Sequence, residues 1–138
     1  MTIFGDVSHI LPLHLPDVTA ADEKEEHADI VLFSPEVHSL PKHCTLFLFD
    51  ATRQVKLPKM EADFAVSCGM CAHDSLSFSS ILPPRALLTL MRSFVFDGVL
   101  YEPLEAKVPF DTSLSLYRNL TCAFVRTLAN PEAKEELA

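Results

Sequence analysis

The stretch Cys44-Thr45-Leu46-Phe47-Leu48-Phe49 is an almost unbroken apolar run that stops at Asp50. A run of this length without polar alternation is typical of a strand buried on both faces. A similar run, Ile30 to Phe33, precedes it along the chain, and a third, Asp63 to Ser67, follows and breaks at Gly69. These three runs predict neighbouring buried strands at the centre of a sheet.

Downstream, polar and apolar residues alternate from Ser75 to Ile81, which predicts a half-exposed strand. The stretch 85–96 fits two structures. Its apolar residues have helical spacing, but its end runs into Asp97-Gly98 and a second apolar segment, which is typical of a hairpin. We take the hairpin, with strands near 88–96 and 99–107.

The last element is a helix over 114–128, because its apolar residues recur on one helical face. Asp111-Thr112-Ser113 offers N-cap residues, and Asn130-Pro131 ends the helix. We therefore predict a single α/β domain over 30–130, with a mixed β-sheet and a C-terminal packing helix. A shorter helix is expected on the other face. The strands are expected near 30–33, 45–49, 63–67, 75–81, 88–96 and 99–107.

The two ends of the chain differ from this domain. Residues 1–29 form an N-terminal arm with an acidic segment at 20–29 and a small apolar cluster at 10–15 that is interrupted by proline. Such an arm packs on its own domain or on a neighbouring subunit, and the sequence leaves both open. Residues 131–138 are expected to be a frayed tail.

Composition restricts the partners. The chain has 138 residues, with 11 basic and 19 acidic side chains and a formal charge of -8, which argues against a surface that follows nucleic-acid phosphates. The start lacks a secretory signal, and no apolar stretch approaches the about 20 residues needed to cross a bilayer. We expect a soluble cytoplasmic protein with free cysteines, no nucleic-acid partner and no membrane partner.

Enzyme motifs are missing. The chain has three glycines and contains neither a G-x-x-x-x-G-K-[ST] loop nor a G-x-G-x-x-G turn. A phosphate cradle needs several glycines, because the backbone must approach the phosphates closely. We therefore expect no nucleotide cofactor, and the sequence leans away from an enzyme without deciding the question.

The sharpest local cluster is Cys68-Gly69-Met70-Cys71 with His73 two residues further on. Two thiols at this spacing can chelate zinc or iron, or carry out disulfide exchange. A structural metal site needs four ligands, so residues such as His43, Cys44 or Cys122 would have to complete it. The competing interpretation is that small thiols pack at the end of a strand beneath a glycine turn.

From Thr45 to Ala129 the order of elements resembles the later part of the Mur ligase central domain. The matching segments are Leu46 to Asp50, Phe64 to Gly69, Ser75 to Ile81, Phe96-Asp97-Gly98 and Tyr117 to Ala123. Mur ligases join amino acids to cell-wall precursors using ATP. Their Thr-Gly-Lys-Thr/Ser loop, carbamylated lysine and magnesium-binding glutamate have no counterpart here. The resemblance implies a related scaffold without the ligase chemistry. Asp50 and Asn119 are the two positions it carries over, neither as catalytic.

The sequence therefore favours a non-catalytic interaction or scaffold module, without a cofactor, that contacts a second copy of itself or another protein. The alternative is a thiol or metal-binding protein centred on Cys68, Cys71 and His73, with zinc or iron as the metal. The two hypotheses differ in one geometric expectation. The metal site requires that this cluster meet further ligands, such as His43 and Cys44, at one place.

Overall fold

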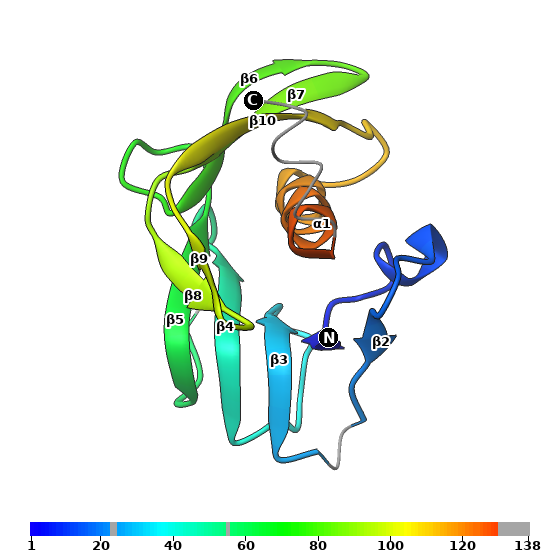
Figure 1. Ribbon diagram of the computed structural model, residues 1–138, viewed down its shortest axis with the longest axis vertical. Coiled ribbons are helices and arrows are strands. Elements are labelled where there is room, and N and C mark those ends of the chain that lie inside the picture. The colour runs from blue at the N-terminus through cyan, green and yellow to red at the C-terminus, as the bar shows by residue number, and fades with distance from the viewer. Residues whose placement is uncertain (23–24, 55, 130–138) are drawn as a thin grey trace.

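Figure 1 shows one mixed sheet, a short separate hairpin and a single long helix, in a computed structural model that describes residues 1–22, 25–54 and 56–129. The strands are β1 (Thr2–Gly5), β2 (Thr19–Ala20), β3 (His27–Leu32), β4 (His43–Asp50), β5 (Glu61–Cys68), β6 (Leu76–Leu82), β7 (Arg85–Leu90), β8 (Phe94–Phe96), β9 (Val99–Tyr101) and β10 (Leu104–Pro109). The sheet has the order β10-β7-β6-β5-β4-β3-β1-β2, and β8 pairs with β9 alone. The six strands β6, β5, β4, β3, β1 and β2 are parallel to one another, whereas β7 and β10 run antiparallel to their neighbours.

The three apolar runs form the central strands β3, β4 and β5, as predicted. Leu46 of β4 lies opposite Ile30 of β3 and Phe64 of β5 in the parallel register. Leu46 and Phe47 point to opposite faces of the sheet, and both are buried, in two separate apolar clusters. A strand covered on both faces needs apolar residues at successive positions, which explains the runs without alternation.

The second face of the sheet is covered by loops. The connections after β3 and β4 contain no helix, and apolar side chains such as Val37, Leu40 and Met60 pack against the cluster around Phe47. The shorter helix expected on this face was therefore wrong for the described residues. Pro35 and Pro41 lie in the connection between β3 and β4. They disfavour a helix there, because proline inside a helix removes a backbone hydrogen bond.

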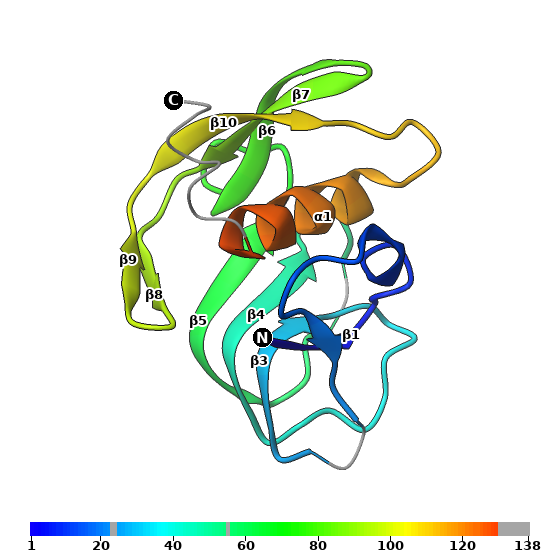
Figure 2. The ribbon, with the colours of Figure 1, turned by 45° about the vertical axis from the view of Figure 1, so that its right-hand side comes forward.

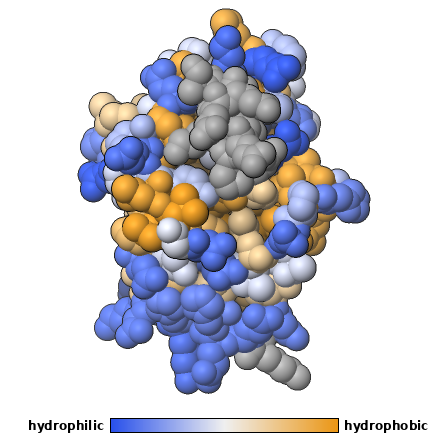
Figure 3. Space-filling view, in the orientation of Figure 1, coloured by the Kyte–Doolittle hydropathy of each residue, from blue (hydrophilic) through white to orange (hydrophobic). Residues whose placement is uncertain are grey.

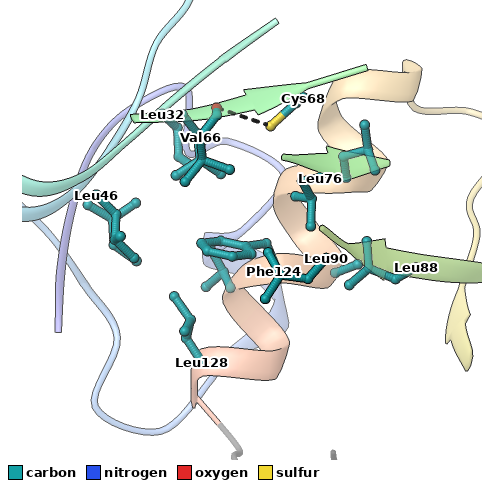
Figure 4. Close-up of a cluster of buried hydrophobic side chains, with 14 of the residues drawn as sticks. Leu32, Leu46, Val66, Cys68, Leu76, Leu88, Leu90, Phe124 and Leu128 are labelled. Atoms are coloured by element: carbon teal, nitrogen blue, oxygen red, sulfur yellow. Dashed lines mark hydrogen bonds between the residues drawn. The ribbon is translucent and has the colours of Figure 1, made fainter. Parts of the chain in front are cut away.

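Helix α1 (Leu116–Ala129) covers the opposite face of the sheet, to which Leu46 points. This confirms the predicted C-terminal helix. Figure 4 shows Phe124 and Leu128 of α1 pointing toward Leu46, Val66 and the side chains of β6 and β7. At the start of the helix the Tyr117 hydroxyl lies 2.8 Å from the carbonyl oxygen of Phe33 and 3.0 Å from that of Leu48. Because these carbonyls belong to the ends of β3 and β4, the contacts set the position of α1 over the parallel strands.

The structure confirms the hairpin at Asp97-Gly98. The strand that leads into it begins at Arg85, but neither strand of the hairpin is continuous. Leu90 pairs with Leu104 and Phe94 pairs with Tyr101, so the three residues 91–93 face the two residues 102–103. Such an extra residue bends a ribbon. The predicted strands at 88–96 and 99–107 are therefore each broken in two, and Phe94, the first residue of β8, packs against Phe124 of α1.

The N-terminal segment joins the sheet of its own domain. β1 lies between β2 and β3, and Ile3 and Ile10 are buried in the cluster beneath α1. A short 3-10 helix, η1 (Leu11–Leu13), follows, and Asp6 forms a two-bond ion pair with Arg118 of α1. The structure thus places the apolar part of the arm on its own chain. Residues 131–138, the predicted frayed tail, lie outside the described residues.

Candidate functional site

The Cys68 to Asp74 segment is a tight turn between β5 and β6. The carboxylate of the buried Asp74 accepts the backbone N–H of Cys71 at 3.0 Å, and the Asp74 N–H donates to the Cys71 carbonyl, also at 3.0 Å. A Cβ at Gly69 would collide with this carboxylate. The glycine is therefore required by the close approach of Asp74, and the turn is shaped by local hydrogen bonds.

The two thiols of this turn have different environments. Cys68 is 1 % exposed, its sulfur donates to the Val66 carbonyl at 3.8 Å, and burial raises its pKa strongly. Cys71 and His73 are exposed on the turn. The thiolate is the form that binds metals and attacks disulfides, so Cys68 is held in its unreactive form. Of the two thiols in this turn, that of Cys71 is the one available to reagents in solution.

The ligands that would complete a metal site lie elsewhere. His43 is opposite Glu61 at the start of β4, whereas Asp50 is opposite Cys68 at the other end of the strand pair. His43 and Cys44 are therefore separated from the Cys68 turn by nearly the full length of β4. In the parts of the chain that the structure describes, no three His, Cys, Asp or Glu side chains are grouped as metal ligands.

His43 instead belongs to a polar chain across three strands. Its Nδ1 lies 2.7 Å from Nδ1 of His27, its Nε2 lies 3.0 Å from the carboxylate of Asp63, and the two rings stack at 4.9 Å. His27 in turn lies 3.5 Å from the Asp29 carboxylate. A 2.7 Å contact between two ring nitrogens requires one to donate and the other to accept. Sequence reasoning missed this pairing because it depends on the register of parallel strands.

The positions carried over from the Mur ligase resemblance hold turns. The Asp50 carboxylate accepts the N–H of Thr52 at 3.0 Å and its hydroxyl at 2.5 Å, which closes the turn after β4. The Asn119 amide donates to the carbonyls of Asp111, Leu114 and Ser115, and its oxygen accepts the Asp111 N–H. Both side chains thus hold neighbouring turns and loops in place.

The structure contains a pocket that the sequence analysis did not find. It has a volume of about 650 Å³ and lies where η1, the β6–β7 turn, the segment after β10 and α1 meet. It is lined by His9, Pro12, Leu13, Pro83, Pro84, Pro109, Phe110, Asp111, Thr112, Leu114, Asn119, Cys122, Ala123 and Arg126. Figure 2 shows these elements gathered around the first half of α1. The prolines and the charged residues of the lining form no recognisable pattern along the sequence, because the walls of the pocket come from four separate segments.

The β8–β9 hairpin has an outer apolar face. Its inner residues Phe94, Phe96 and Tyr101 are buried against the body of the domain. On the outer side, two apolar side chains that pair across the hairpin are exposed: Val95 (45 %) and Leu100 (56 %). Figure 3 shows hydrophobic surface where this hairpin lies, in contrast to the hydrophilic lower end of the molecule. Exposed apolar side chains that cluster in this way are typical of contact surfaces.

No family model, curated protein or solved structure matches this chain. Within the described residues, no helix has the length and apolar character that crossing a bilayer requires.

Proposed function

We propose that this chain is a non-catalytic interaction or scaffold module that associates with a second copy of itself through the outer face of the β8–β9 hairpin. The supporting observation is the exposed pair Val95 and Leu100 on a hairpin whose other face packs on the domain through Phe94, Phe96 and Tyr101. Among the described residues, β8 and β9 pair with each other and with no other strand. An exposed apolar face on such a hairpin favours contact with another chain.

Charge favours this surface over the rest of the molecule. Two copies with a formal charge of -8 repel each other, and the contact must therefore lie where charge is low. Asp97 is the one charged residue between Phe94 and Tyr101. Because a standard interface buries about 800 Å² per partner, two apolar side chains predict a weak dimer that depends on concentration.

Light scattering coupled to size-exclusion chromatography tests this proposal across a range of protein concentrations. We expect the mass to rise from monomer toward dimer as concentration increases, and Leu100→Lys to keep the chain monomeric. The matched control is Leu82→Lys, because Leu82 is 76 % exposed but lies at the β6–β7 turn. A strict monomer at every concentration, or a dimer that Leu82→Lys breaks and Leu100→Lys does not, contradicts the proposal.

A second candidate function is a thiol or metal-binding protein centred on Cys68, Cys71 and His73. The observation in its favour is that Cys71 and His73 are both exposed on one short turn. Elemental analysis of protein purified without chelator decides the metal branch, since the site predicts stoichiometric zinc or iron. The redox branch predicts that Cys71→Ser removes the most reactive thiol in a titration with a chromogenic disulfide. The absence of both results removes this candidate.

The relation to Mur ligases and the cytoplasmic location are also proposals. The support for the first is the order of strands, hairpin and helix, whereas the ATP-binding loop of that family is absent from the sequence. A scaffold without that loop is expected to bind no ATP. Calorimetry with ATP and magnesium tests this expectation, and tight nucleotide binding contradicts a non-catalytic module.

A further inference from the structure

We propose that the pocket beside α1 binds a small amphipathic carboxylic acid: an apolar body, a carboxylate that pairs with Arg126, and a hydroxyl that donates to His9. This is a function separate from self-association, because the pocket and the outer face of the β8–β9 hairpin share no residue.

The pocket has the size and lining of a site for a small organic molecule. Such sites have volumes of about 300–1,000 Å³ and are lined mainly by apolar side chains with a few polar groups. The volume here is about 650 Å³, and most of the lining residues are apolar. Four of them are prolines, which hold their backbone in one conformation without a ligand. A preformed wall loses little entropy when a ligand binds.

Two of the polar residues in the lining already hold the loop before α1. Oδ1 of Asp111 accepts the Ser113 N–H at 2.9 Å and the Ser113 hydroxyl at 2.6 Å. Asn119 makes four hydrogen bonds to the loop before α1. These residues build the wall of the pocket, and their hydrogen bonds explain why the segment after β10 folds back over the helix.

Two other polar groups have no such partner. Nδ1 of His9 and Nε of Arg126 are both buried, and neither has a hydrogen-bond partner among the residues that the structure describes. Both residues line the pocket. A buried polar atom without a partner costs about 1–3 kcal/mol, so two in one pocket favour a ligand that satisfies them.

The hydrogen bonds of His9 determine which group its free nitrogen requires. The Thr121 hydroxyl donates to the Arg118 carbonyl at 3.2 Å, so its oxygen accepts from Nε2 of His9 at 2.8 Å. Burial lowers the pKa of His9, which keeps the ring neutral at pH 7. With its one proton on Nε2, the ring presents Nδ1 as an acceptor. A hydroxyl or N–H of the ligand is the complementary donor.

Arg126 determines the charge of the ligand. A guanidinium remains protonated in proteins and has only donors, so its buried Nε requires an acceptor. The guanidinium also interacts with the Cys122 thiol, whose pKa burial raises, so that neighbour stays uncharged. Of the acceptors available in small molecules, a carboxylate makes the strongest pair with arginine. The apolar body then lies against Phe110, Leu13 and the prolines.

The test uses three probes that differ by one group. Para-hydroxyphenylpropanoate has the aromatic body, the carboxylate and the hydroxyl; phenylpropanoate lacks the hydroxyl; and para-hydroxyphenylpropanol lacks the charge. Each is titrated into the 138-residue protein while the assigned amide resonances of the protein are recorded by NMR. We expect the shifts to cluster on the pocket lining, with the first probe binding about tenfold more tightly than either of the others, since each missing contact is of that order.

Variants link each probe to its residue. Arg126→Gln is expected to weaken binding of the two acids about tenfold and leave the alcohol unchanged. Arg92→Gln is the matched control, because Arg92 is exposed and lies outside the pocket. His9→Phe is expected to remove the difference between the acid with a hydroxyl and the acid without one.

Several outcomes overturn the proposal. Equal affinity of the acid and the alcohol for the natural protein shows that Arg126 does not recognise the carboxylate. Shifts that map to the hairpin or the sheet edge place the binding elsewhere, and the absence of shifts shows that these ligands are not bound. If a variant fails to fold, the comparison of the three probes on the natural sequence still decides. None of these outcomes depends on the oligomeric state.

Discussion

Gly5 and Gly98 both have a positive φ, but their surroundings differ. Gly5 has a φ of 113°, and a Cβ there would collide with the carbonyl oxygen of Leu32 on the neighbouring strand. Gly98 has a φ of 73° in the β8–β9 turn, and a Cβ there would meet nothing within 4 Å. Gly5 is therefore required twice, for its backbone conformation and for the close approach of β3, whereas Gly98 is required once.

We predict that Gly5→Ala destabilises the protein far more than Gly98→Ala. At Gly98 the cost is the strain of a left-handed residue, about 1 kcal/mol. At Gly5 the backbone of β1 or β3 must also move, so we expect a loss of about 3 kcal/mol or more. Urea denaturation followed by circular dichroism measures both variants. Equal losses would show that the contact with Leu32 does not restrict this position.

The β8–β9 hairpin is the element whose position depends most on side-chain packing. Phe94 stacks on Tyr101 at 5.0 Å and contacts Phe124 of α1 at 5.5 Å between ring centroids. It also meets Phe64 of β5 edge to face. Since the hairpin pairs with no other strand, these aromatic contacts hold it against the helix.

Phe94→Ala is therefore expected to destabilise the protein by about 3–5 kcal/mol, as large-to-small changes of buried phenylalanine do. The neighbouring Val95→Ala is the control, because Val95 points outward, and its cost is expected within about 0.5 kcal/mol. Chemical denaturation gives both values. Hydrogen exchange of the hairpin amides shows whether the tip detaches first, and unchanged exchange there would contradict the assigned role of Phe94.

At the scale of the whole molecule, buried thiol and phenol groups limit the stability of the fold at high pH. Burial raises the pKa of Cys44 to about 12 and raises those of Cys68 and Tyr117 further from their ordinary values. In the unfolded chain a thiol ionises near its ordinary pKa of 9.0. A raised folded pKa means that the folded state retains its proton to higher pH. The stability is therefore complete below the unfolded pKa and decreases as the pH rises from there through the folded pKa.

We predict that the free energy of unfolding falls between pH 9 and pH 12, the interval bounded by the ordinary and the folded pKa of Cys44. Each such group contributes a slope of at most about 1.4 kcal/mol per pH unit. Urea titrations across this range measure the slope. Cys44→Ala should reduce it, whereas Cys71→Ala, at an exposed thiol, should not. An identical slope in both variants would show that Cys44 does not ionise on unfolding.

Much of the fold could be predicted because its signals are local. The runs at 30–33, 45–49 and 63–67 are strands, the 97–98 turn closes a hairpin, and the helix lies close to 114–128. In each case the pattern reports burial along one segment. The expected short helix failed for a related reason, since a loop that packs Val37 and Leu40 buries the same face without helical periodicity.

The candidate sites depend on contacts between distant parts of the chain. His9 meets Thr121 across 112 residues, and His27 meets His43 through the register of two parallel strands. Periodicity along the chain predicts which residues turn inward, because burial is a property of one strand or helix at a time. Which inward residues meet is decided by strand order, register and the placement of α1, and these depend on packing free energy summed over the whole molecule.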